Sequence, residues 1–557
     1  MATSPGDEQT VQYMLQRWQD PQTGLDDAWR EEYKVFLSFP DPQSPNKVTV
    51  GESSLRLWHP VLLAHAARPV LVISPSNETQ FTASEKEVPY EPAQQHPDVV
   101  QPYAAYSPPG HPNGKLIYAN QGKVSDYEVL NKTMNLAGTI AIVRYGGAGR
   151  AAKAINAAPF GVAGVLVYTD PLDINDGLSN ETETYPHSWY LPPSGVERGS
   201  FNTHFGDLLT PYLAAKEHTY RIPEEDITGI PPIPIQPIGF EDAEELIWSA
   251  PVEWRGALKC PYNVGGPGFK PTSLYNNSDV QLDIYNKPNA TLRVQGSPAV
   301  QSVVFTATKE VKTPGSDSTT VYDNWLRFFN RTSPSLGVVP NVALMTGAGS
   351  DYAAFIHFLG ITSMDIAYTY DRSKTKARIY PAYHTAYDTF NYSSKYIDPG
   401  FKSHQTVART AGNVLLRLAD SLLVPFNCSD YAETLEKFLA TANAVAKFRT
   451  EATNLNKIIQ DSDLSKETPL KVRRINDQLM LLERAFLDPL AFPEKYGFRH
   501  VLWASRSSSF STFPGLADAF AQANQTNLPQ DWAQVHKHLS IVTQAIEGAT
   551  HTLGDVI

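Results

Sequence analysis

One histidine stands in a setting that could serve metal chemistry. His384 lies within the run 380–390 (YPAYHTAYDTF), four residues before Asp388, and this run follows a strand-like stretch, Asp365 to Thr369. Imidazole is a common metal ligand and a common acid or base. A single histidine among aromatic residues is also typical of a satisfied core position. The residues of this segment leave both interpretations open.

Zinc hydrolases need several histidines and carboxylates that converge on one point, usually within recognisable spacings. The chain contains no HExxH motif, and its glutamate pairs at 31–32, 224–225 and 244–245 are typical of solvated or helix-starting positions. His536 and His538 are two residues apart on a predicted helix and therefore point to different faces. There is also no GxSxG elbow and no P-loop. Local motifs alone predict no catalytic site.

A glycine-rich loop could bind a dinucleotide. Residues 147–152 (GAGRAA) match the GxGxxA pattern, which lets backbone amides approach a pyrophosphate at a helix N-terminus, and Asp170 follows the next strand. One such unit is only part of a nucleotide-binding fold, and Asp170-Pro171 is equally typical of an ordinary turn. Both interpretations stay open on these residues.

Strands and helices alternate around this loop. Thr139 to Tyr145 alternates like a strand, Arg150 to Ala157 is a helix-forming run, and Ala163 to Tyr168 predicts a second strand, which together make one βαβ unit. The proline-rich run Ile230 to Gly239 cannot be helical and is predicted to be an extended connection between domains.

Beyond about residue 420 the apolar period becomes helical, which predicts a C-terminal helical bundle. Two sets of apolar residues are each expected to share one helical face: Leu435, Phe438, Leu439, Ala442 and Val445, and Trp532, Val535, Leu539, Val542 and Ile546.

Length and composition predict a multidomain globular protein. The chain has 557 residues, of which 42% are hydrophobic and 19% are charged, so several domains can each bury a core. The 46 basic and 58 acidic side chains give a net charge of −12, which argues against a nucleic acid partner.

Three features of the sequence indicate whether the protein enters the secretory pathway. Cys260 and Cys428 allow one disulfide or two free thiols. No signal peptide or membrane span is evident, yet nine Asn-x-Ser/Thr sequons suggest secretory ancestry. They lie at Asn77, Asn131, Asn180, Asn276, Asn289, Asn330, Asn391, Asn427 and Asn524.

Several long segments together resemble one known family. The chain is similar to the glutamate carboxypeptidase II and transferrin receptor family, and most of all to its aminopeptidase branch. The similar segments are 18–40, 138–170 (GTIAIVRYGGAGRAAKAINAAPFGVAGVLVYTD), 188–199 (SWYLPPSGVERG), 231–246, 347–388, 475–489 (INDQLMLLERAFLDP) and 513–515. Together they extend over nearly the whole chain.

The resemblance implies an α/β fold with three parts. A zinc aminopeptidase-like α/β/α domain is expected at 1–92 and 248–420, a protease-associated domain is expected to be inserted at 93–247, and a helical dimerisation domain is expected at 421–557. The glycine-rich loop then corresponds to a turn of the protease-associated domain, and the nucleotide interpretation is dropped.

The chain departs from the family where the metals bind. In active relatives a His, a bridging Asp, a Glu-Glu pair and another Asp lie between the segments that here read 281–288 (QLDIYNKP) and 289–296 (NATLRVQG), which abut in this chain. The α/β domain is therefore expected to be incomplete, and only His384 matches a ligand position. The family uses two zinc ions and a general-base glutamate, so we expect neither stoichiometric zinc nor a catalytic residue here.

Other family positions describe what remains of the substrate pocket. Arg150 matches a residue that faces substrate in the family. Tyr383, Gly349 and Ser350 are expected to line the same pocket. Asp365 and Ala367 replace two arginines of the carboxypeptidase, and Asp365 is suited to a free N-terminal amine or to a capping role.

Two further family sites are also altered. The sensor of a C-terminal glutamate falls in the serine run 507–509, which argues against acidic dipeptides as substrates. Thr210 and Tyr212 resemble part of a calcium site whose two glutamates belonged to the absent block.

These observations predict a catalytically inactive member of an exopeptidase family whose parent activity is removal of amino acids from small peptides. The alternatives are a receptor-like binding protein and an active membrane-linked aminopeptidase. We expect a homodimer through the C-terminal helices, small peptides as ligands of any remaining pocket, and no nucleic acid partner.

Family members are type II membrane proteins with an extracellular domain. This sequence shows neither anchor nor signal, so a cytosolic location is expected if it is made as written. The absent block suggests a splice form or a mis-assembled product.

Overall fold

The structure is a computed structural model in which residues 5–22, 24–38, 41–46, 49–50, 65–67, 71–73, 79–249, 290–345, 347, 349–439, 442–463, 466–488, 496–504 and 512–554 are described. They form two compact units. The first comprises Met1–Leu282 and Lys374–Ile397, and the second comprises Asp283–Ser373 and Asp398–Ile557.

A four-stranded parallel sheet is the core of the first unit, with the strand order β12-β10-β9-β8. The strands are β8 (Leu116–Tyr118), β9 (Ile140–Arg144), β10 (Gly164–Tyr168) and β12 (Ile235–Ile238). Every residue of β8, β10 and β12 is buried, as expected for parallel strands covered on both faces. The expected strands of the βαβ unit are confirmed.

Helices connect these strands. α2 (Val124–Asn131) joins β8 to β9, and α3 (Arg150–Ala157) joins β9 to β10 with the bounds that the sequence predicts. Gly146 and Gly147 have positive φ and form the tight turn that starts α3. Asp170 caps α4 (Pro171–Ile174) by accepting from the Leu172 N–H at 2.9 Å. The glycine-rich loop and Asp170 are thus structural turns.

The proline-rich run 230–239 is extended but is not simply a connection between domains. Its second half is β12, which pairs in parallel with β10 at the edge of the sheet. Pro237 is tolerated because an edge strand needs ladder donors on one side only. Ile235 donates its outward N–H to Ser107 Oγ at 3.0 Å.

The remaining elements of the first unit are two helices, α1 and α5, and a set of short strands and turns. They are α1 (Pro5–Trp18), β1 (Asp41–Asn46), β2 (Thr49–Val50), β3 (His65–Ala67), β4 (Leu71–Ile73), β5 (Thr79–Thr82), β6 (Ala104–Ala105), β7 (Asn113–Gly114), β11 (Gly199–Ser200), α5 (Phe240–Ser249) and α9 (Phe390–Tyr392), with 3-10 turns at Pro92–Gln95, Ala158–Phe160, Glu181–Glu183 and Glu224–Asp226 and a π-helical turn η10 at Ser393–Ile397.

The second unit has a three-stranded sheet with the order β16-β13-β17. β13 (Thr291–Gly296) is parallel to β16 (Val342–Leu344) and antiparallel to β17 (Met364–Thr369). The strand that follows the expected deletion is therefore paired on both sides. Leu292 and Val294 pack into a core with α7 (Gln301–Glu310), α8 (Val321–Phe328) and α10 (Lys402–Asp420), while Arg293 is exposed.

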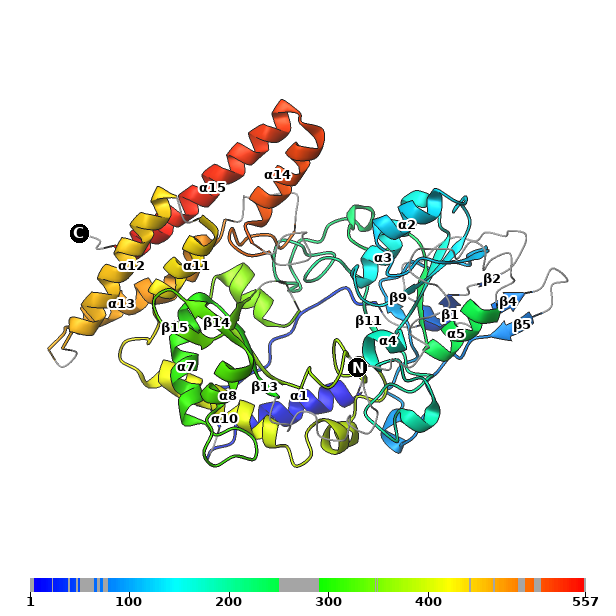
Figure 1. Cartoon of the computed structure of the whole chain (residues 1–557), viewed down its shortest axis with the longest axis horizontal. Coiled ribbons are helices and arrows are strands. Elements are labelled where there is room, and N and C mark those ends of the chain that lie inside the picture. The colour runs from blue at the N-terminus through cyan, green and yellow to red at the C-terminus, as the bar shows by residue number, and fades with distance from the viewer. Residues whose placement is uncertain are drawn as a thin grey trace. The chain divides into compact units, whose positions relative to one another are not determined.

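The helical bundle predicted beyond residue 420 is confirmed (Figure 1). It contains α11 (Ser429–Leu439), α12 (Asn443–Asp461), α13 (Pro469–Leu481), α14 (Pro514–Thr526) and α15 (Pro529–Leu553), with the 3-10 turn η11 (Glu483–Phe486). The unit also contains the 3-10 turn η8 (Pro298–Val300), the hairpin of β14 (Asn330–Ser333) and β15 (Gly337–Pro340), and the π-helix η9 (Ala354–Leu359).

Two expected helical faces need correction. Leu435 and Val445 belong to different helices, because α11 ends at Leu439 and α12 begins at Asn443. On α15 the predicted stripe is buried only toward its C-terminal end, at Val542 and Ile546, whereas Leu539 is 46% exposed. Periodicity marks an apolar stripe but does not reveal what covers it.

Candidate functional site

The backbone of Arg198 fixes the orientation of His384. His384 has φ = 60°, and its carbonyl accepts from the Arg198 N–H at 2.9 Å. Its Nδ1 lies 2.9 Å from the carbonyl oxygen of Arg198. Because a carbonyl only accepts, we assign the proton to Nδ1. This leaves the Nε2 lone pair available for a metal or a proton.

A buried carboxylate holds this pair of segments together. Glu87 accepts from both terminal nitrogens of Arg198, at 3.1 and 2.6 Å, and from the N–H of Ala386 at 3.1 Å. At the next residue, the Tyr387 hydroxyl donates to Val88 O at 2.9 Å. The loop that carries His384 is therefore anchored just after the histidine.

Aromatic rings and charges set the protonation of His384. Tyr383 stacks on the imidazole with ring centroids 3.7 Å apart, and Tyr380 donates to Asp388 Oδ2 at 2.7 Å. Burial, together with the nearby Arg150, lowers the pKa of His384, while burial raises the pKa of Asp388. A neutral imidazole at pH 7 is the form that binds a metal.

Arg150, the first residue of α3, belongs to a charged cluster beside this loop. It donates to Glu197 Oε1 at 2.7 Å, and Arg378 donates to Glu197 Oε2 at 3.1 Å. Arg150 Nη2 also lies 3.3 Å from His384 Nδ1. Its buried Nε has no hydrogen-bond partner among the described residues. The structure thus brings together Arg150, Tyr383 and His384 of the predicted pocket.

The residues around His384 do not fit a pair of zinc ions. Within the described ranges, no three His, Cys, Asp or Glu side chains are grouped as metal ligands. Asp388 is engaged by Tyr380, and Glu197 is shared by two arginines. One imidazole nitrogen is too few for a two-metal centre.

The expected calcium residues lie in one loop of the first unit. The Thr210 hydroxyl donates to Asp207 Oδ2 at 2.9 Å, and Tyr212 is exposed. The carboxylates that a calcium ion needs are not grouped around them in the described part of the chain.

The other predicted pocket residues belong to the second unit. Gly349 and Ser350 are exposed just after β16, and Asp365 lies on β17 opposite Gln295 of β13. Ala367 is exposed on the same strand, opposite Arg293. The serine run 507–509, the abutment at 288–289 and Cys260 lie outside the described residues. Cys428 is a buried free thiol whose pKa burial raises to about 12.

A buried histidine cluster in the second unit was missed by the sequence analysis. The His357 Nε2–H donates to Gly347 O at 2.9 Å, and His500 Nε2 donates to Glu483 Oε1 at 2.9 Å. The two imidazole rings are 6.0 Å apart. No short motif joins these residues, which come from three separate segments, so spacing could not have found them.

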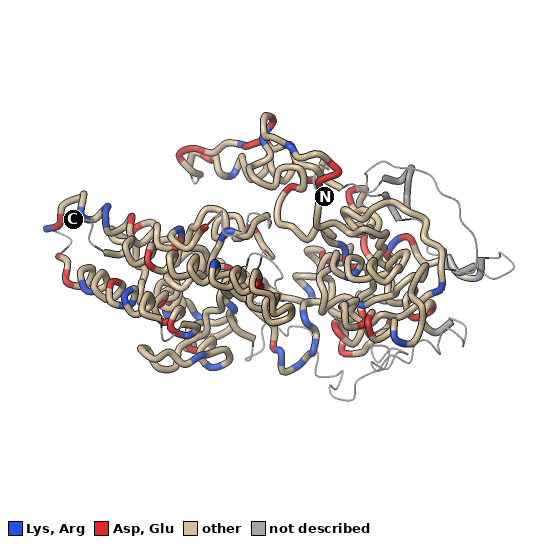
Figure 2. The backbone as a smooth tube through the Cα atoms, turned by 90° about the horizontal axis from the view of Figure 1, so that it is seen from above, with Lys and Arg blue, Asp and Glu red and all other residues tan. Residues whose placement is uncertain are grey.

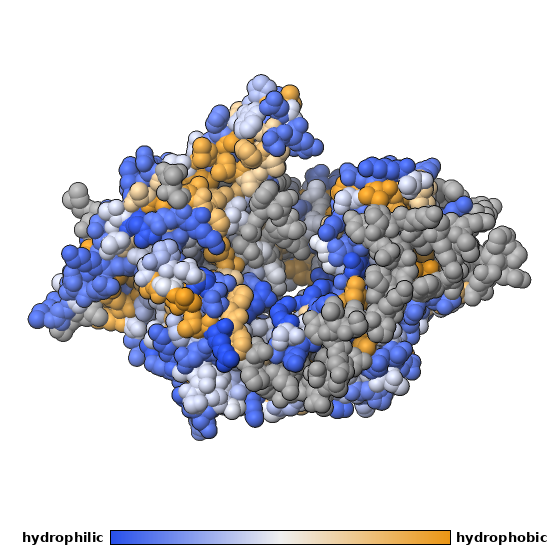
Figure 3. Space-filling model, viewed as in Figure 1, coloured by the Kyte–Doolittle hydropathy of each residue, from blue (hydrophilic) through white to orange (hydrophobic). Residues whose placement is uncertain are grey.

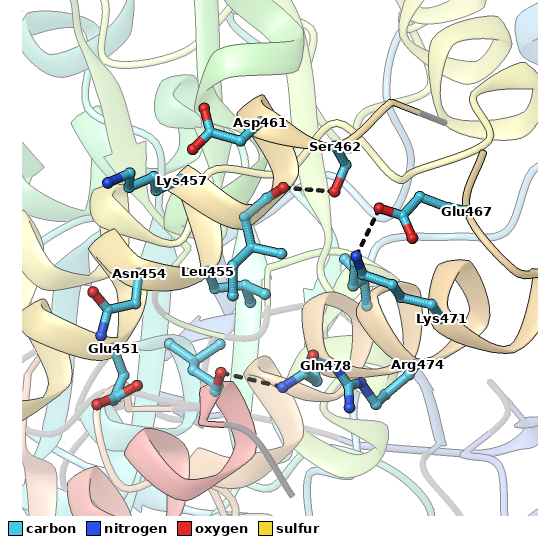
Figure 4. Close-up of a pocket in the computed structure, with 13 residues that line it drawn as sticks. Glu451, Asn454, Leu455, Lys457, Asp461, Ser462, Glu467, Lys471, Arg474 and Gln478 are labelled. Atoms are coloured by element: carbon cyan, nitrogen blue, oxygen red, sulfur yellow. Dashed lines mark hydrogen bonds and ion pairs between the residues drawn. The ribbon is translucent and has the colours of Figure 1, made fainter. Parts of the chain in front are cut away.

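Three pockets are formed by described residues within single units. One of about 530 Å³ adjoins the His384 loop and includes Asp98, Arg198 and Asp388. Another, of about 570 Å³, lies between α12, α13 and the end of α15 (Figure 4). There Lys471 pairs with Glu467 at 2.6 Å, and Gln478 donates to Leu553 O at 3.1 Å. The third, of about 670 Å³, lies beside β16 and α11.

Charge is interspersed over the described part of both units. Lys and Arg alternate with Asp and Glu along the tube without a continuous basic stripe (Figure 2). A nucleic acid surface normally gathers its basic residues on one face. That the chain has no nucleic acid partner, as the net charge of −12 indicates, stays a prediction.

Two family models match the chain. The PA domain matches residues 101–203, and the transferrin receptor-like dimerisation domain matches residues 433–554. The aminopeptidase NAALADL1 of Mus musculus is 45% identical over 689 aligned positions, covering 99% of this chain and 89% of the relative. This chain belongs to the glutamate carboxypeptidase II and transferrin receptor family. Its fold is accordingly mixed α/β, with an inserted PA domain and a C-terminal dimerisation domain.

Other members of the family are also similar. NAALADL1 of Rattus norvegicus is 44% identical over 692 positions, covering 100% of this chain and 90% of the relative. The probable glutamate carboxypeptidase LAMP1 of Arabidopsis thaliana is 26% identical over 576 positions, covering 83% of this chain and 82% of that protein.

The alignment with the mouse relative shows that this chain lacks residues that the relative has. It extends over 689 positions, while this chain has 557 residues, so at least 132 positions (689 − 557) have no residue in this chain. The described helices of this family member include none that is long and apolar enough to cross a membrane.

Proposed function

We propose that this family member does not hydrolyse peptides. The observation that carries the proposal is His384, whose free Nε2 has the orientation of a metal ligand but no grouped carboxylates beside it among the described residues. The gap of at least 132 positions against the mouse aminopeptidase supports it, since the absent block is where the family's other ligands would lie.

Hydrolysis of a peptide bond at neutral pH needs an activated water and a base to take its proton. When bound, the zinc pair of the family would supply Lewis-acid activation of the attacking water. The residues retained here hold a neutral imidazole and an arginine-carboxylate cluster in place. The imidazole could accept a proton, but the retained residues supply no activated water for it to deprotonate.

The test is to measure zinc per protomer together with the release of amino acids from unblocked dipeptides. The mouse NAALADL1 protein, purified identically, is the positive control for both measurements. We expect less than one zinc per protomer and no turnover. Turnover with about two zinc ions per protomer, as in a two-metal site, would refute the proposal.

A chimera identifies the cause. The mouse residues that have no counterpart here would be inserted between Pro288 and Asn289, and His384→Ala would be introduced into the same chimera. We expect the insertion to create zinc binding and turnover, and H384A to remove the turnover. An inactive, folded chimera would mean that residues other than the absent block prevent catalysis.

A receptor-like binding role is the second candidate. The pocket of about 530 Å³ beside the His384 loop keeps Arg198 and Asp388 in its lining, and Glu87 anchors that loop. Peptide libraries presented to the purified chain would test it. Saturable binding without cleavage would favour this role over an inert form.

We also propose that the chain is a homodimer through its dimerisation domain. Phe520 and Leu539 expose about half of their side chains on α14 and α15, where Figure 3 shows hydrophobic surface. Light scattering of Leu539→Glu should give a monomer, because a buried charge opposes association. Leu470→Glu, on α13 and 77% exposed, is the matched control and should stay dimeric.

A further inference from the structure

The third pocket lies in the second unit, far in sequence from the His384 loop. It is enclosed by the end of β13, the start of α7, the β14 strand, β16 and α11, and its volume of about 670 Å³ is in the range of small-molecule sites. Ligands of α/β sheets commonly bind near the carboxyl ends of parallel strands, and β13 and β16 are such a pair.

The pocket lining carries five charged side chains. Its carboxylates are Asp430, Glu433 and Glu436, and its cations are Arg331 and Lys437. Glu433 accepts from Arg331 and, at 2.7 Å, from the Ser333 hydroxyl.

Glu436, in turn, pairs with Arg449, which stands outside the lining. Glu433 and Glu436 are thus both paired with arginines, and, among the described residues, Asp430 is the carboxylate that is not.

Asp430 has an unused acceptor. Gln301 donates to its Oδ1 at 3.1 Å, while Oδ2 has no hydrogen-bond partner among the described residues. The residue is only 6% exposed. Arg331 donates to the Gln301 side-chain oxygen at 2.7 Å, so the amide cannot turn to serve both carboxylate oxygens. A buried acceptor left without a donor is costly, which favours a ligand that supplies one.

The rest of the wall is partly apolar. Its larger apolar side chains are Pro298, Pro334, Val342, Leu344 and Phe438, and its uncharged polar side chains are Gln301, Thr332, Asn341 and Thr434. A bare divalent cation would need several oxygen ligands, and no three metal-binding side chains are grouped in the described residues. The lining instead matches a molecule with one cationic donor and an apolar body.

We propose that this pocket binds a primary amine carried on an apolar group, with the ammonium donating to Asp430 Oδ2. Shielding from bulk water strengthens the attraction between the two charges. The apolar body would contact Val342, Leu344 and Phe438. This site is separate from the His384 loop and does not depend on peptide hydrolysis.

The binding test uses phenethylammonium and its neutral analogue phenethyl alcohol on the full chain, measured by ligand-observed NMR and calorimetry. We expect saturable binding of the amine and at least about tenfold weaker binding of the alcohol, as for a lost charge-assisted hydrogen bond. Equal binding of both, or no saturable binding of the amine, would overturn the proposal.

Variants localise the site. Asp430→Asn should weaken amine binding by about tenfold or more and leave alcohol binding unchanged. Asp461→Asn is the matched control, because Asp461 lines the pocket between α12 and α13. Circular dichroism confirms that each variant is folded. Full amine affinity in D430N, or an equal loss in D461N, would refute the assignment.

The pH dependence gives a test without mutation. Burial and the neighbouring Glu433 raise the pKa of Asp430 to about 7, against the effects of Arg331 and Gln301. Cys428 also lies near, but its thiol stays neutral because its pKa is raised to about 12. Amine affinity should therefore fall as pH is lowered from 8 to 6, while the alcohol is unaffected. An amine affinity that rises over this range would contradict the site.

Discussion

His500 donates from Nε2 to Glu483 Oε1 at 2.9 Å, and both side chains are completely buried. His500 Nδ1 accepts from the Leu502 N–H at 3.2 Å, which assigns the ring proton to Nε2. The pair joins η11 to the segment 496–504 inside the second unit. A second imidazole, His357, packs edge-on against His500 and holds Gly347.

Removing the carboxylate of this pair should destabilise the fold more than removing a surface carboxylate. Glu483→Ala leaves the Nε2–H of the neutral His500 imidazole without its acceptor in the core, and we expect a loss of about 1–3 kcal/mol in the free energy of unfolding. Urea unfolding followed by tryptophan fluorescence measures it, and Trp503, one of the nine tryptophans, stacks on His500. Glu467→Ala removes a surface partner of Lys471 and should cost less than about 1 kcal/mol. Equal losses would contradict this account of the pair.

His357 should make the second unit sensitive to acid. Burial and His500 lower its pKa to about 4, against 6.5 for the unfolded residue. The unfolded state binds the proton first, so stability is full above pH 6.5 and falls by about 3 kcal/mol as pH drops to 4. His357→Gln should flatten that part of the stability profile relative to the parent. Parallel profiles of the two proteins would show that His357 does not cause the sensitivity.

Asp242 should respond in the opposite direction. Burial raises its pKa to about 7, although the Ser84 N–H donates to Oδ2 at 3.0 Å. The native state therefore keeps the proton longer than the unfolded state, and stability is lost as pH rises from 3.8 to 7. Asp242→Asn should raise the melting temperature at pH 8 much more than at pH 5. A lower melting temperature at pH 8 would mean that the ionised carboxylate is stabilising.

Two glycines should respond oppositely to alanine. Gly360 has φ = 60°, and a Cβ there would lie 2.4 Å from Arg484 Cα, so Gly360→Ala should cost about 2 kcal/mol or more. Gly412 lies within α10, with nothing within 4 Å of an added Cβ, and Gly412→Ala should gain about 0.5–1 kcal/mol. Thermal unfolding of both variants measures the difference. A higher stability of G360A would show that the backbone near Arg484 can move aside at little cost.

The local elements were predictable where the pattern is strong and self-contained. α3 begins and ends where the helix-forming run does, because a glycine turn and a buried face fix both of its ends. β12 was mistaken for a connection, since its prolines argue against a central strand and the sequence does not show that it lies at an edge. Edge position is a tertiary property that no local pattern contains.

Some residues of the candidate sites could be found from the sequence and others could not. His384 stood out in its local sequence and Arg150 was found through a family segment. The structure places Arg150 Nη2 3.3 Å from His384 Nδ1, although 234 residues separate the two. The Glu483–His500 pair and the free oxygen of Asp430 depend on burial and on missing partners. Those properties arise only when distant segments pack, so residue types and spacing could not reveal them.

The prolines of β12 have a consequence for behaviour at high concentration. A foreign strand adds to a sheet through unpaired N–H groups along its rim. On the outward side of β12, Pro237 has no N–H, and that of Ile235 already donates to Ser107 Oγ. A neighbouring molecule finds no donors there, so this rim should resist intermolecular strand addition and help keep concentrated protein from aggregating.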